Sequence, residues 1–258
     1  MKGLKILLIG IVIFTFSSGI LAQTSKKKKR PRVVKTTTVS TTPTTTQTAS
    51  NTTLTDTEIS GGLKEALFNG VKFAVDTLGK ENGFLNDTRV KIPLPSSLQK
   101  MEKALRIAGQ GKMVDDFVAS MNHAAEKAVP VAIDVFMDSI KQMTFNDVRN
   151  ILFSGQDDSA TQFFRRTSEE TLRGKFRPIV EKFTNEVGVT QKYKNMIGKY
   201  GFVGQLFGKD ATDLDGYVTQ KALDGTFFMV AEQEKKIRKD PIGTGSAILK
   251  KVFGAIFK

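Results

Sequence analysis

Residues 112–143 read KMVDDFVASMNHAAEKAVPVAIDVFMDSIKQM and form the longest helical pattern in the chain. Apolar side chains recur there every three or four residues, which is the period of an α-helix with one buried face. The apolar positions are Val114, Phe117, Val118, Met121, Ala124, Ala125, Ala128, Ala132, Val135, Phe136 and Ile140. Pro130 lacks a backbone N–H, so we expect it to kink or split this helix.

The same helical period continues on both sides of this segment. Thr144 and Thr167 each precede acidic residues in a pattern typical of a helix N-terminus, and Pro178 is expected to kink the helix that begins at Thr167. The residues 83–95 break the period, because their prolines favour an extended backbone. Further helices are predicted over 59–78, 96–108, 144–153, 167–187, 190–200, 213–239 and 246–257. Residues 58–258 are therefore predicted to form an all-α, bundle-like domain.

The N-terminus has the layout of an export signal. Lys2 and Lys5 precede an apolar run over 6–16, and Ala22 is a small residue suited to cleavage. Residues 1–22 are therefore predicted to be a signal peptide, which would make the mature protein periplasmic or secreted. The alternative is an uncleaved N-terminal anchor, because positive charge tends to stay on the cytoplasmic side and the larger cluster follows the apolar run.

Residues 23–57 have the composition of a disordered tether. The part over 36–57 is rich in Thr and Ser and too poor in apolar side chains to offset the entropy of ordering. Such basic runs are either solvated spacers or attract polyanions, and outside the inner membrane those polyanions are anionic glycans or lipids rather than nucleic acid. The basic residues are Lys26, Lys27, Lys28, Lys29, Arg30 and Arg32.

Charge and cysteine content narrow the possible chemistry. The net charge is +13, and residues 23–60 are its densest part, with seven basic and two acidic residues. The chain contains no cysteine. This excludes disulfides, thiolate metal ligands, cysteine nucleophiles and lipidation of an N-terminal cysteine.

Several short motifs resemble, in the same order, a bacterial family of exported proteins catalogued as domain of unknown function 4197. The resemblance covers residues 58–254 and implies an all-helical envelope domain without a known activity. Members of that family often have Arg at the position of His123. The motifs include Gly83-Phe84, Ile92-Pro93-Leu94-Pro95, Met121-Asn122-His123-Ala124-Ala125-Glu126, Pro178-Ile179-Val180, Ala222-Leu223-Asp224-Gly225, Lys236-Ile237-Arg238 and Leu249-Lys250-Lys251-Val252-Phe253-Gly254.

His123 is the only histidine in the chain. A Ser–His–Asp site needs a histidine base beside a nucleophile, and no Gly-x-Ser-x-Gly motif accompanies His123. Zinc sites usually combine several His or Cys ligands. We therefore interpret His123 as a surface or packing residue and expect no cofactor.

Oxygen-bearing side chains form the one candidate site. At helical spacing, Asp115, Asn122 and Glu126 lie along one edge of the 112–143 helix, and Asp147, Asp157 and Asp158 follow in caps or loops. Such groups could hold Ca²⁺ or Mg²⁺ or act as an acid–base pair on a glycan. The alternative is a structural network that pairs them with Arg106, Arg149, Arg165 or Arg166.

The C-terminal residues also allow two interpretations. The amphipathic segment 246–257 fits either a helix docked on its own domain or an interfacial membrane helix. The Gly243-Thr244-Gly245-Ser246 turn before it could bind an anion. It lacks the lysine and the spacing of a phosphate-binding loop, which favours a plain helix-entry turn.

Two hypotheses for the function follow from these patterns. The first is a non-catalytic envelope protein that binds a glycan, a lipid or a protein partner. The second is a carboxylate- or metal-dependent hydrolase of an envelope polymer, with Asp115, Asn122 and Glu126 at its site.

Overall fold

The computed structural model describes residues 55–186, 190–194 and 209–240, and these belong to one compact unit spanning Asn51–Lys258. They form helices and loops without a strand, which confirms the predicted all-α bundle. The predicted signal peptide, the predicted tether up to residue 54, the predicted 243–246 turn and the predicted 246–257 helix lie outside the described residues. The elements are α1 (Asp56–Leu78), η1 (Ser96–Leu98), α2 (Gln99–Ile107), α3 (Gly111–Ala128), η2 (Val129–Val131), α4 (Ala132–Gln142), α5 (Phe145–Phe153), α6 (Ser159–Glu186), α9 (Lys209–Thr212) and α10 (Leu214–Lys239).

Pro130 splits the long apolar segment as expected. Helix α3 ends at Ala128, a single 3₁₀ turn carries Pro130, and α4 begins at Ala132. The apolar faces of α3 and α4 are both buried. One amphipathic pattern therefore supplies two helices of the core.

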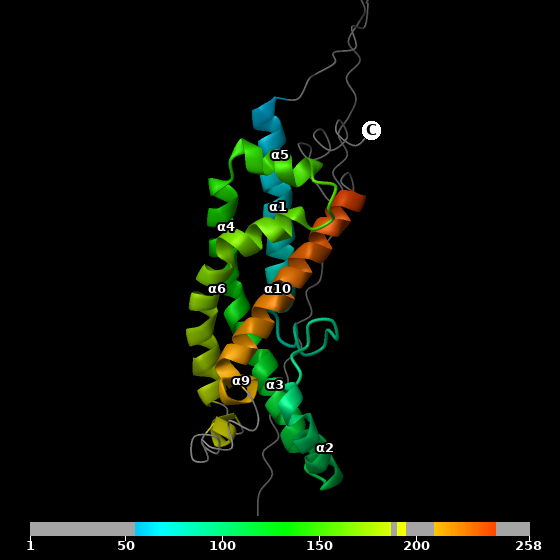
Figure 1. Cartoon of the computed structure of the whole chain (residues 1–258), viewed down its shortest axis with the longest axis vertical. Coiled ribbons are helices and arrows are strands. Elements are labelled where there is room, and N and C mark those ends of the chain that lie inside the picture. Colours follow the sequence, from blue (N-terminus) through cyan, green and yellow to red (C-terminus); the bar gives the residue numbers. More distant parts are fainter. Residues whose placement is uncertain (1–54, 187–189, 195–208, 241–258) are drawn as a thin grey trace, which may run out of the picture. The chain divides into compact units, whose positions relative to one another are not determined.

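Aromatic side chains join α4, α6 and α10 at the centre of the bundle. The ring of Phe136 meets Phe164 edge to face, with centroids 5.2 Å apart, and meets Phe227 at 5.8 Å. All three side chains are fully buried. Helix α10 runs diagonally across α1 and also packs against α3 and α6 (Figure 1). It therefore links α1, α3 and α6.

Local caps define the beginnings of α1 and α5. Thr55 and Glu58 form a capping box that starts α1 at Asp56, and Thr144 and Asp147 form another that starts α5. The hydrogen bonds from Thr144 hold the pKa of Asp147 below its ordinary value. The cap predicted at Thr144 is therefore confirmed.

The predicted start of α6 at Thr167 is wrong, because the helix begins at Ser159. The Thr167 hydroxyl donates to the carbonyl of Phe163 inside the helix rather than capping it. The true N-terminus is capped from α10: the backbone N–H groups of Ala160 and Thr161 donate to Glu234, both at 2.9 Å. The helix continues through Pro178, which is exposed.

Among the described α-helices longer than four residues, α2 is the one without a buried residue. The predicted serine cap at Ser96 or Ser97 is wrong, because η1 precedes α2 and neither serine makes a capping hydrogen bond. Gly109, at φ +76°, ends the helix as expected. No residue of α2 is fully buried.

Among the described helices, none combines the length and the apolar character that crossing a membrane requires.

Candidate functional site

The structure separates the acidic residues that the sequence placed in one candidate site. Asn122 and Glu126 are buried, with 0% and 3% of their surfaces exposed, whereas the Asp115 side chain is 66% exposed and pairs with Arg106 at 2.9 Å. Asp147 caps α5, and Asp158 accepts from the side chain of Gln162. Only Asn122 and Glu126, one turn apart on α3, act together.

The Glu126 carboxylate binds the backbone of the loop that follows α1. The N–H of Asn82 donates to one oxygen at 3.1 Å, and those of Phe84 and Leu85 donate to the other at 3.1 and 3.3 Å. His123 Nδ1 lies 2.8 Å from the oxygen that Asn82 uses. Backbone amides and one histidine therefore occupy both carboxylate oxygens.

Asn122 binds the same loop further along. Its carbonyl oxygen accepts from the N–H of Ile92 at 2.8 Å, and its amide donates to the Ile92 carbonyl at 2.9 Å. The hydroxyl of Tyr217 donates to the Pro93 carbonyl at 3.0 Å, and burial raises the pKa of this tyrosine to about 12, so it remains a donor. We call residues 82–95 the braced loop.

The braced loop begins in a conformation that only certain residues adopt. Asn82 has φ +63°, a left-handed value that asparagine tolerates. A Cβ on Gly83 would lie 2.5 Å from the carbonyl oxygen of Thr77. Phe84 is fully buried, and a Cβ on Gly225 of α10 would lie 2.6 Å from its ring. The loop is thus fitted closely to α1 and α10 and anchored by α3.

These contacts define what the predicted cluster can do. Asn122 and Glu126 bind backbone groups of the braced loop. Asp115 lies at the other end of α3, Asp147 and Asp158 lie on other elements, and all three have partners of their own. Among the described residues, no group of three or more His, Asp or Glu side chains lies close enough together to hold a metal ion. The cluster positions a loop.

An apolar pocket lies on one side of the braced loop, between α2, α3 and residues 190–194. Its volume is about 380 Å³, within the range of small-molecule sites. Burial raises the pKa of Tyr193 to about 12, so the phenol of this residue stays neutral. Lys192 is the exposed cation at the edge. We call this hollow the apolar pocket, and its lining residues are Leu94, Met101, Leu105, Met113, Val114, Phe117, Lys192 and Tyr193.

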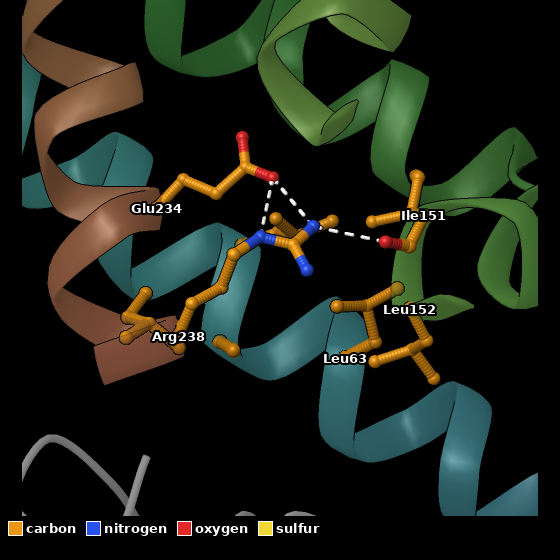
Figure 2. A pocket seen from close by; sticks show the side chains of 8 residues that line it. Leu63, Ile151, Leu152, Glu234 and Arg238 are labelled. Atoms are coloured by element: carbon orange, nitrogen blue, oxygen red, sulfur yellow. Dashed lines mark hydrogen bonds and ion pairs between the residues drawn. The ribbon is translucent and has the colours of Figure 1, made fainter. Parts of the chain in front are cut away.

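A second, much smaller hollow adjoins the buried ion pair of Glu234 and Arg238 at the C-terminal end of α10. Its volume is about 20 Å³, room for about one water molecule. Figure 2 shows Arg238 reaching both the Glu234 carboxylate and the carbonyl of Ile151, with Leu63 and Leu152 beside them. This pair joins α10 to α5 and α6, and we interpret it as structural.

The sequence does contain a pattern that indicates the apolar pocket. Leu98, Met101 and Leu105 recur at helical spacing, and Met113 and Phe117 continue the apolar surface on α3. Methionines pack adaptably and are frequent at binding surfaces. Periodicity could not show that the other described residues leave this face partly uncovered.

Comparison with known proteins identifies a family but no activity. Residues 53–254 match a family described as "Protein of unknown function (DUF4197)". No curated protein and no solved structure matches the chain. The match covers well over half of the sequence, so this chain belongs to the DUF4197 family.

Proposed function

We propose that this protein is a non-catalytic binding protein of the cell envelope and that its apolar pocket takes the hydrocarbon chain of an anionic lipid. The pocket is the observation that carries the proposal. The described residues that line it are almost all apolar, which favours a hydrocarbon occupant through burial of surface from water. Lys192 at its edge complements an anionic head group.

The lightly packed wall of the pocket supports a binding role. Helix α2 has no fully buried residue, and Ile107 at its end is 88% exposed. Elements with few buried contacts open at low free-energy cost. Helix α2 can therefore move enough to admit a chain, while α3, with its buried face, stays fixed.

The arrangement of the carboxylates does not favour the hydrolase alternative. A general base must reach the substrate through a free oxygen. Both oxygens of Glu126 already accept hydrogen bonds, and Asp115 is paired with Arg106 on the surface. A binding function does not require either residue to have a free carboxylate oxygen.

The envelope location and the role of the tether are part of the same proposal. Cleavage after Ala22 would release a chain whose basic tether, Lys26–Lys29 with Arg30 and Arg32, can attach to anionic glycans or lipid head groups. We expect exported protein to begin at Gln23, as read by N-terminal sequencing of the periplasmic or secreted fraction. An intact Met1 in that fraction would contradict the cleavage.

The apolar pocket is tested with a fluorescent fatty acid, cis-parinaric acid, titrated into the full chain. Leu105→Glu is expected to weaken binding at least about tenfold, about 1.4 kcal/mol, because it places a carboxylate inside the apolar wall. The matched control is Ile107→Glu, which adds the same charge to the same helix at a position outside the pocket. It should bind within about twofold of the parent.

The controls also separate the pocket from other apolar parts of the chain. The N-terminal apolar run is the same in both variants, so binding there would leave them equal, and that equality would contradict the proposal. Lys192→Gln should weaken binding of the fatty acid but not of the matching fatty alcohol. An absence of any saturable binding would also contradict the proposal.

A further inference from the structure

On the other side of the braced loop lies an open polar groove of about 450 Å³. Residues of the braced loop, of the start of α6 and of α10 line it. Pro93 belongs to this groove, while the next residue, Leu94, belongs to the apolar pocket. The two hollows are therefore separated by one extended segment. We call this second hollow the basic groove.

Four basic and two acidic side chains line the basic groove. Arg89 is held by Asp87 through two short hydrogen bonds, at 2.6 and 2.9 Å, which offsets its charge. Lys91 and Lys221 are exposed and form no ion pair with any acidic side chain in the described residues. These two lysines supply the uncompensated positive charge of the groove.

Arg165 is a further cation of the basic groove, and its position is fixed by its contacts. Its guanidinium lies 4.5 Å from the ring centroid of the buried Phe227, and its Nη1 is 3.4 Å from Glu169 and 3.8 Å from Asp224. Stacking and ion pairs hold the group in one place while its side chain stays 41% exposed. An arginine held in this way loses little conformational entropy when it binds a ligand.

The position of Lys91 is fixed by the contacts of the next residue. Asn122 binds both backbone groups of Ile92, and Tyr217 binds the Pro93 carbonyl. The backbone that carries Lys91 is therefore held before a ligand arrives. Three cations from distant parts of the chain, at positions 91, 165 and 221, converge on one hollow with a fixed frame.

The other lining groups indicate what kind of anion fits. Asp158 and Asp224 offer carboxylate oxygens that accept hydrogen bonds from hydroxyl groups, whereas they would repel a simple phosphate ion. Pro93 and the partly exposed Phe228 add apolar edges. A ligand with a negative charge, hydroxyl groups and an apolar ring face would match the cations, the carboxylates and the apolar edges of the groove. We infer that the basic groove binds an anionic sugar.

Calorimetric titration of the full chain with glucuronic acid, glucose 6-phosphate and glucose tests this inference. We expect one or both anionic sugars to bind and glucose to bind at least about tenfold more weakly, a difference of about 1.4 kcal/mol. The two anionic sugars distinguish a carboxylate from a phosphate as the recognised group. Inorganic phosphate serves as a further probe and should compete poorly.

Paired substitutions locate the binding in the groove. Lys91→Gln with Lys221→Gln should weaken binding of the anionic sugar at least about tenfold. The control pair, Lys127→Gln with Lys175→Gln, removes the same charge from exposed lysines that do not line the groove. It should change affinity by less than about twofold. All four are surface positions, so folding is not at risk.

Three results would overturn the inference. These are an absence of binding by either anionic sugar, an equal loss in both pairs of variants, and competition by inorganic phosphate as strong as that by the sugar phosphate. The outcome is independent of the apolar pocket, because neither lysine lines it. The double variant Lys91→Gln with Lys221→Gln should still bind cis-parinaric acid as the parent does.

Discussion

Replacing Glu126 with alanine is expected to lower the free energy of unfolding by about 2–4 kcal/mol. The substitution leaves the N–H groups of Asn82, Phe84 and Leu85 without their acceptor. A buried donor without a partner costs about 1–3 kcal/mol, and water can reach the two of these residues that are only partly buried. Urea denaturation followed by circular dichroism measures the loss.

A graded series makes the role of Glu126 specific. Glu126→Gln should lower the free energy of unfolding less than Glu126→Ala does. The glutamine keeps one oxygen that accepts hydrogen bonds, and only its NH₂ group faces N–H donors that it cannot bind. Asp115→Ala, on the same helix, removes an exposed carboxylate and should change stability by less than about 1 kcal/mol. Equal losses at positions 115 and 126 would show that Glu126 does not anchor the loop.

Replacing Glu126 with alanine should weaken ligand binding in both the apolar pocket and the basic groove, because the braced loop forms a wall of each. Leu94 lines the apolar pocket, and Lys91 lines the basic groove. When Glu126 releases the start of the loop, the remaining anchor is Asn122 with Tyr217. A loop held at one end has more conformations to lose when it binds a ligand, so both affinities should fall together.

Local signals made much of this fold predictable. The apolar period of residues 112–143 placed α3 and α4 in the core, and Pro130 separated them because its missing N–H acts within one turn. The cap at Thr144 was predicted correctly for the same reason: Thr144 and Asp147 are three residues apart. Such features depend only on neighbours along the chain.

The start of α6 was not predictable from local signals. Thr167, Ser168 and Glu169 have the composition of a cap, yet the helix is already formed there because Glu234, more than seventy residues away, caps it at Ala160 and Thr161. A local sequence pattern cannot predict a hydrogen-bond acceptor that lies on another helix. Tertiary contact therefore overrode the local preference.

The candidate site was predictable in its members but not in its purpose. Helical spacing correctly placed Asn122 and Glu126 on one side of α3. Most of their partners are backbone groups of residues 82–92. Every residue type carries these backbone groups, so the sequence does not distinguish them. Of the acidic side chains in that cluster, Glu126 binds the braced loop, and the two hollows beside this loop depend on how the helices pack.

The second large effect is expected at Glu234, whose replacement with alanine should cost about 3–5 kcal/mol. Only 5% of its side chain is exposed, and it pairs with Arg238 at 2.7 Å while capping α6. Its loss leaves a cation that is 17% exposed without its acid, and it leaves the N–H groups of Ala160 and Thr161 without an acceptor. Breaking one side of a buried pair carries this penalty.

A double-mutant cycle separates the ion pair from the cap. Arg238→Ala should cost less than Glu234→Ala, because the N-terminus of α6 still stabilises the carboxylate. The double variant should be more stable than the sum of the two losses implies, since no buried charge remains. Asp76→Ala, which breaks the exposed Lys72–Asp76 pair of the same spacing, should cost less than about 1 kcal/mol. Additive losses at positions 234 and 238 would show that the two side chains act separately, and Glu234 would then act on α6 through the cap alone.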